Sequence, residues 1–112
     1  MANELSFDLE LQSLRERSVD RLLKADVFDR EAFDTLLLYL DGKAHLLCAE
    51  YAIPKQVLSC LREATSVILS RVEHVPAAKA NIEVAGQFEM LLDLMIMGET
   101  LADRATGVPR TV

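Results

Sequence analysis

Two histidines and two cysteines are the side chains in this sequence best suited to acid–base, nucleophilic or metal chemistry. His74 stands near the expected end of a helix, where a protonated imidazole interacts favourably with the helix dipole. No second histidine or cysteine cluster stands at the spacing of metal ligands, and no glycine-rich phosphate loop or Ser/His/Asp arrangement is present. We therefore expect no enzyme activity, no cofactor and no metal site.

His45 lies in the segment Ala-His-Leu-Leu-Cys-Ala (residues 44–49), which is expected to be helical. This segment resembles the histidine phosphotransfer domains, four-helix bundles in which an exposed histidine carries a phosphoryl group between a kinase and a receiver domain. The family motif has lysine three residues after the histidine and glycine four residues after it, where this sequence has Cys48 and Ala49. The resemblance implies a phosphoacceptor role for His45. The default interpretation of His45 from the residues themselves is a partly buried structural histidine.

Cys48 and Cys60 lie inside apolar helical patterns, which favours two buried thiols that pack as small hydrophobic side chains. A disulfide is the alternative. The N-terminus shows no basic segment followed by an apolar run, and no uncharged stretch reaches the roughly 20 residues that span a bilayer. We therefore expect reduced thiols, a cytoplasmic location and no membrane contact.

Hydrophobic periodicity typical of helices runs almost throughout the 112 residues, a length that suits a single domain. The pattern predicts an all-α fold, a small antiparallel helical bundle of three to four helices. The expected helices cover residues 4–24, 30–51, 54–74 and 77–105, with a loose tail at 108–112.

Local signals place the expected helix starts. Asp29 is expected to cap the second helix by accepting backbone hydrogen bonds. Phe28 and Phe33 then have the spacing of a hydrophobic staple across that cap. Pro54 and Pro76 suit the first turns of the third and fourth helices, where a missing N–H costs nothing.

The segment Met-Leu-Leu-Asp-Leu-Met-Ile-Met (residues 90–97) is apolar around nearly the whole circumference of a helix. Packing on one core requires a single apolar stripe, which a seam beginning at Val84 already supplies. Because large exposed apolar patches are rare on monomers, we expect part of this segment to form an intermolecular surface. A homodimer with two-fold symmetry is the expected assembly. The candidate interface residues are Leu92, Leu94, Ile96 and Met97.

The 18 acidic and 12 basic residues give a formal net charge of −6. The basic residues are interspersed with acidic ones, which argues against binding to nucleic acid. An acidic chain instead favours a partner protein with a basic surface. We therefore predict a non-catalytic protein-binding module, either an inhibitor or immunity-type protein that covers a basic enzyme site or a dedicated chaperone. The alternatives are phosphotransfer through His45 and a purely structural homo-oligomer.

Overall fold

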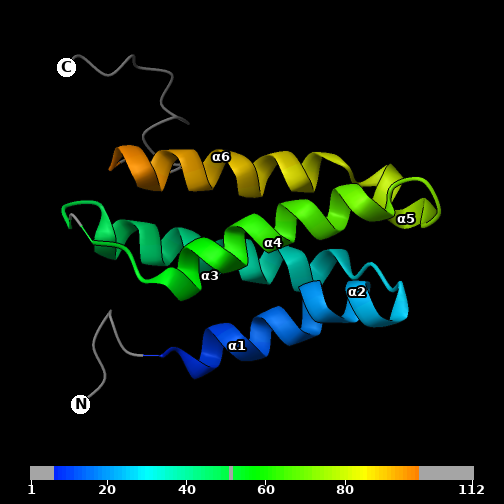
Figure 1. Ribbon diagram of the computed structural model, residues 1–112, viewed down its shortest axis with the longest axis horizontal. Helices are drawn as coiled ribbons and strands as arrows, with labels where there is room; N and C mark the ends of the chain where they lie inside the picture. Colours follow the sequence, from blue (N-terminus) through cyan, green and yellow to red (C-terminus); the bar gives the residue numbers. More distant parts are fainter. Residues whose placement is uncertain (1–6, 51, 99–112) are drawn as a thin grey trace.

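The computed structural model describes residues 7–50 and 52–98, and within these ranges the chain is helical with no strand. The helices form a bundle of four rods (Figure 1). The first rod consists of α1 (Leu9–Arg15), a π-helical turn η1 (Glu16–Asp20) and α2 (Arg21–Ala25). The others are α3 (Arg30–Leu47), α4 (Lys55–Arg71), and α5 (Pro76–Ala80) followed by α6 (Glu83–Met97). The predicted all-α fold is confirmed.

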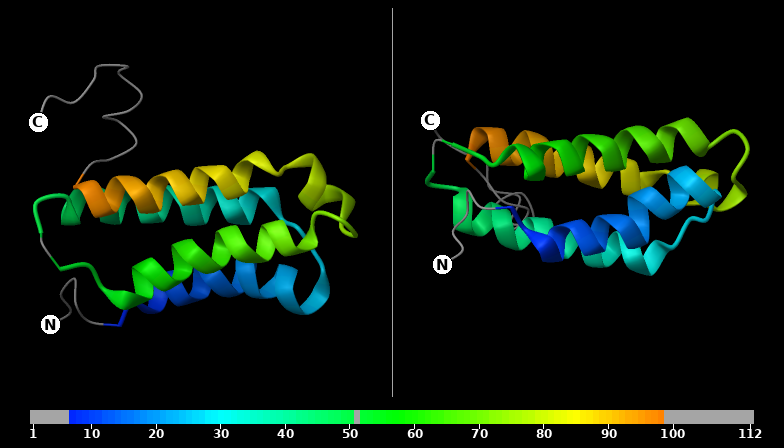
Figure 2. Two further views of the ribbon diagram at one scale, coloured as in Figure 1. Left: turned by 45° about the horizontal axis from the view of Figure 1, so that its top comes forward. Right: turned by 60° about the horizontal axis from the view of Figure 1, so that its bottom comes forward.

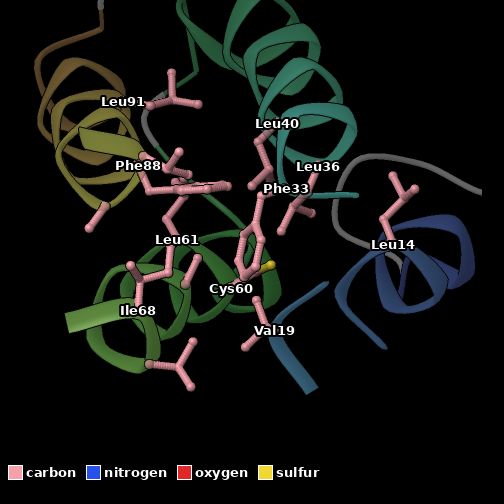
Figure 3. Packing of buried hydrophobic residues seen from close by; sticks show 14 of the residues in the cluster. Leu14, Val19, Phe33, Leu36, Leu40, Cys60, Leu61, Ile68, Phe88 and Leu91 are labelled. Atoms are coloured by element: carbon pink, nitrogen blue, oxygen red, sulfur yellow. The ribbon is translucent and has the colours of Figure 1, made fainter. Parts of the chain in front are cut away.

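Consecutive rods run in opposite directions, and the order around the core is α1, α3, α6 and α4 (Figures 1 and 3). As a result, α3 and α6 are neighbours that run in the same direction (Figure 2, left). Near their first residues, Arg30 Nη1 lies 3.0 Å from Glu83 Oε1. Near their last residues, Gly98 lies so close to Cys48 that a Cβ would stand 3.0 Å from the Cys48 carbonyl oxygen. Contacts at both ends therefore fix the position of α6 along α3.

The starts predicted for the second, third and fourth helices lie within one residue of the observed starts of α3, α4 and α5. The Asp29 carboxylate accepts a hydrogen bond of 3.1 Å from the backbone N–H three residues later. The rings of Phe28 and Phe33 stack with centroids 4.9 Å apart, as expected of a hydrophobic staple. Pro76 is the first residue of α5, and α4 begins directly after Pro54. These contacts join residues close in sequence, which is why the pattern alone could predict them.

The first rod differs from the predicted helix over residues 4–24. Its described part begins after Asp8, so Phe7 precedes the helix and is 63% exposed. The π-helical turn contains one residue more than an α-helical turn. As a result, Val19, five residues after Leu14, is buried on the same core-facing side of the rod. Inside this turn the buried Ser18 hydroxyl donates to the Leu14 carbonyl at 2.7 Å.

The predicted fourth helix, residues 77–105, is interrupted and ends early. The Asn81 side-chain amide donates to the Ala77 carbonyl at 2.8 Å and so closes α5 before α6 begins. Gly98 adopts the left-handed conformation with φ 77° and ends α6, because only glycine takes this conformation without a steric penalty. Residues 99–112 lie outside the described residues. The ends of α3 and α4 also fall three or four residues before the predicted ends at 51 and 74.

The core fills the space between all four rods (Figure 3). Phe33 of α3 and Phe88 of α6 meet edge to face with ring centroids 6.1 Å apart, and both are fully buried. Leu61 of α4 and Val19 of η1 complete the cross-section from the other two rods. One side of α6 therefore faces the core, and its opposite side faces away from the other helices.

Candidate protein-binding face

The outer side of α6 carries large apolar side chains that the core does not cover. Ile96 is 67% exposed, Met97 51% and Met90 42%. The exposure expected of Ile96 and Met97 is therefore confirmed, while their role in an interface stays a prediction.

The other two candidate interface residues lie elsewhere. Leu94 is fully buried, and Leu92 is half-buried and packs against the core cluster. The inclusion of Leu94 in an exposed interface is therefore wrong. α6 packs against both α3 and α4, so the covered part of its circumference is wider than the single seam assumed from the sequence.

The exposed positions of α6 form one connected face. We call it the α6 face, and its members are Glu83, Gly86, Glu89, Met90, Asp93, Ile96 and Met97. Positions 83, 86, 90, 93 and 97 alternate spacings of three and four residues. This is the spacing at which one helix contacts another in a coiled coil. The face therefore has the periodicity of a second packing surface on the outside of the bundle.

The charges of the α6 face are all negative. α6 contains three acidic residues and neither lysine nor arginine. Glu83 is paired with Arg30, which also lies 3.0 Å from Asp34. Glu89 and Asp93 form no ion pair with another described residue. Their spacing makes them a like-charge i,i+4 pair, which costs about 0.2–0.5 kcal/mol in an isolated helix.

Gly86 lies in the middle of α6 and on its exposed side. Apart from the adjacent backbone of α6 itself, no atom lies within 4 Å of the position that a Cβ would occupy, so the fold does not require glycine for space. A glycine inside a helix destabilises it by about 0.5–1 kcal/mol relative to alanine. What glycine does provide is a bare stretch of backbone that another chain can approach closely. Gly42 in α3 is also exposed, with open space around it.

The phosphoacceptor candidate His45 lies on the surface of α3. Its side chain is 53% exposed, and Nε2 stands 3.7 Å from Oδ2 of Asp41, one helical turn earlier. His45 is therefore more exposed than the expected partly buried histidine. Exposure of His45 leaves the imidazole accessible to another molecule, as phosphotransfer would require.

The two cysteines occupy different environments. Both are free thiols, with Cys60 buried in the core and Cys48 exposed near the end of α3. The expectation of two buried thiols is therefore correct for Cys60 and wrong for Cys48. Burial raises the pKa of the Cys60 thiol to about 11, so this thiol is protonated and unreactive near neutral pH.

A polar cluster that the sequence did not reveal ties the start of α1 to α3 and α4. The Asp8 carboxylate accepts the Tyr39 hydroxyl at 2.5 Å and the Leu11 backbone N–H at 3.0 Å, and Lys43 Nζ lies 3.1 Å away. The backbone of Asp8 also exchanges two 2.8 Å hydrogen bonds with the Gln56 side chain. The capping position of Asp8 before an apolar run was a detectable signal, but its partners 31 and 48 residues away were not.

The cluster favours a charged Asp8 and a neutral Tyr39. Burial raises the pKa of the Asp8 carboxyl, but the hydrogen bonds from Tyr39 and Leu11 and the charge of Lys43 outweigh it and lower the pKa overall. Burial and the Asp8 carboxylate raise the pKa of Tyr39 to about 12. These shifts stabilise the fold without preparing either group for acid–base catalysis at neutral pH.

Two surface cavities lie along the first rod. A shallow cavity of about 590 Å³ is lined by charges of both signs that offset one another, namely Glu16, Arg17, Asp20, Arg21, Lys24 and Asp29. A smaller one of about 170 Å³ lies between α1 and α4, with Cys60 among its lining residues. Its charged lining residues Arg15 and Asp20 pair with each other, and Arg15 also pairs with Glu63. Neither cavity offers an unpaired buried polar group to a ligand.

Across residues 7–50 and 52–98, no group of three or more His, Cys, Asp or Glu side chains is placed to hold a metal ion. None of the helices described in those ranges combines the length and the hydrophobicity needed to cross a membrane. Comparison with models of protein families, with curated protein sequences and with solved structures found no match.

Proposed function

We propose that this protein is a non-catalytic protein-binding module. The observation that carries the proposal is the α6 face, where Met90, Ile96 and Met97 stand exposed among acidic side chains on a helix without a basic residue. Methionine is flexible and polarisable, so it adapts to the shape of a bound partner. The negative charge of the face and the net charge of −6 would attract a basic partner surface.

Within this class, the inhibitor or immunity-type role is the first candidate. An acidic face with adaptable apolar side chains suits the covering of a basic enzyme cleft, where charge attraction speeds encounter and apolar burial slows dissociation. A dedicated chaperone is the second candidate, because an exposed methionine surface also suits the binding of an unfolded apolar segment.

The test compares two variants with similar exposure in the native bundle. Met97 on the α6 face is 51% exposed, and Leu23 on α2 is 50% exposed on a rod that does not adjoin α6. Tagged wild type, Met97→Lys and Leu23→Lys are used to isolate binding proteins from the native source. We expect one protein to be retained by wild type and Leu23→Lys and lost by Met97→Lys.

Equal retention by all three proteins would place the binding site away from α6, and the absence of any stoichiometric protein partner would contradict the proposal. The captured partner then separates the two roles. If the complex blocks an enzymatic activity of the partner, the module is an inhibitor. If the partner is active in the complex but aggregates without it, the module is a chaperone.

The exposure of His45 favours phosphotransfer as a second candidate function. The Asp41 carboxylate 3.7 Å from the ring opposes it, because a phosphoryl group would add negative charge beside an existing one. Incubation of wild type and His45→Gln with a small phosphoramidate donor, followed by mass spectrometry, tests this candidate. An acid-labile phosphoryl adduct on wild type alone would support it, and an unmodified wild type would exclude this reaction with that donor.

A further inference from the structure

We propose that the partner segment recognised by the α6 face is a basic amphipathic helix from a different protein. This inference rests on the proposed protein-binding function and specifies the chemistry of the partner. It is carried by the spacing of the exposed positions, by the open backbone at Gly86, and by Glu89 and Asp93, which form no ion pair among the described residues.

The spacing indicates the shape of the partner. Met90 and Met97 are seven residues apart, two helical turns, and lie on the stripe of the α6 face whose spacing alternates between three and four residues. A partner helix with apolar residues at the same repeat can place its side chains between these methionines. An extended strand would match this repeat poorly, because its side chains alternate with a period of two.

Gly86 indicates where the two helices come closest. It lies one turn before Met90 on the same stripe, and no side chain or other helix lies within 4 Å of the position that a Cβ would occupy. A helix that crosses there can approach the α6 backbone without meeting a side chain. The absence of a side chain at Gly86 therefore allows close helix contact in a complex, whereas the isolated bundle does not require glycine at this position.

The charges favour a basic partner over a second copy of this chain. A two-fold pairing of α6 faces would bring together three acidic residues from each copy, and neither helix supplies a lysine or arginine. Glu89 and Asp93 would then repel the same residues of the partner. A helix with lysine or arginine beside its apolar stripe would instead pair with both carboxylates.

The probe is a fluorescent synthetic peptide of about 18 residues, five helical turns, with leucines at alternating spacings of three and four and lysines elsewhere. One control peptide replaces every lysine with glutamate. A second has the same composition as the probe in a scrambled order that removes the apolar stripe. Fluorescence anisotropy measures their binding to the full-length protein. We expect the first peptide to bind at least about tenfold more tightly than either control, with affinity falling as salt is added.

Two matched protein variants locate the site. Gly86→Arg and Gly42→Arg make the same change in net charge at exposed mid-helix glycines that have open space around them. Both replace glycine with a better helix former, so neither is expected to unfold the bundle. Gly86→Arg should weaken peptide binding by about tenfold or more, because it adds bulk and positive charge at the contact, whereas Gly42→Arg should change it by less than about threefold.

Equal effects of the two variants would show non-specific charge attraction and would overturn the inference, as would equal binding of the scrambled peptide. Light scattering on the wild type tests the alternative occupant. Dimerisation that Gly86→Arg abolishes would assign the face to a second copy and also overturn the inference. If the peptide fails to bind but a native partner is lost specifically from Met97→Lys, the protein-binding function stands and the basic helix is refuted.

Discussion

Replacement of Asp8 offers the sharpest test of how the first rod is held against the bundle. Asp8→Ala removes the cap of α1 at a cost of about 1 kcal/mol. It also removes the acceptor of the Tyr39 hydroxyl, a hydrogen bond to a charged group that contributes about 1.5–3 kcal/mol. The expected loss in the free energy of unfolding is therefore about 2.5–4 kcal/mol. Asp8→Asn retains a capping oxygen and should lose only the second contribution.

The pH dependence of the free energy of unfolding distinguishes the contribution of the Asp8 charge from that of the side chain's shape. Because the pKa of Asp8 is lowered in the folded protein, its charge stabilises the fold fully above the ordinary value of 3.8. This contribution is lost as the pH falls through the folded pKa. The stability difference between wild type and Asp8→Asn should therefore be largest near neutral pH and shrink in acid.

Urea unfolding of wild type, Asp8→Asn and Asp8→Ala at neutral and acid pH measures these differences. A double-mutant cycle with Tyr39→Phe isolates the contribution of the Asp8–Tyr39 pair. An Asp8→Asn variant as stable as wild type at neutral pH, or a difference that does not change with pH, would refute the assigned role of the carboxylate.

Three further predictions follow from the burial of individual side chains. Leu94→Ala should lower the free energy of unfolding by about 2–5 kcal/mol, and Ile96→Ala by no more than about 0.5 kcal/mol. Similar urea midpoints for the two variants would contradict the burial of Leu94 and the exposure of Ile96. A thiol reagent should label Cys48 in the native protein and Cys60 only after unfolding, so rapid labelling of both thiols would contradict the burial of Cys60. Because the pKa of Tyr39 is raised from 10.0 to about 12, its stabilising contribution should be complete below pH 10 and lost as the pH rises through 12. Circular dichroism in alkaline titrations should show this loss for wild type and a smaller one for Tyr39→Phe.

The sequence alone determined the helical class of the fold and several helix boundaries, because these depend on interactions within a few residues. The Asp29 cap, the stacking of Phe28 on Phe33 and the placement of Pro76 all join positions within one or two turns. The end of α6 at Gly98 was missed because the apolar pattern continues beyond it. A left-handed glycine ends a helix whatever pattern follows.

The tertiary structure decided which faces of these helices are covered. Leu94 is buried although it lies outside the seam that begins at Val84, a placement that no periodicity within α6 reveals. Asp8 forms hydrogen bonds with Tyr39 and Gln56 because three separate rods meet at that end of the bundle. The α6 face itself is what the remaining helices leave uncovered. A helix has one apolar pattern, but the number of its neighbours determines how much of that pattern reaches solvent.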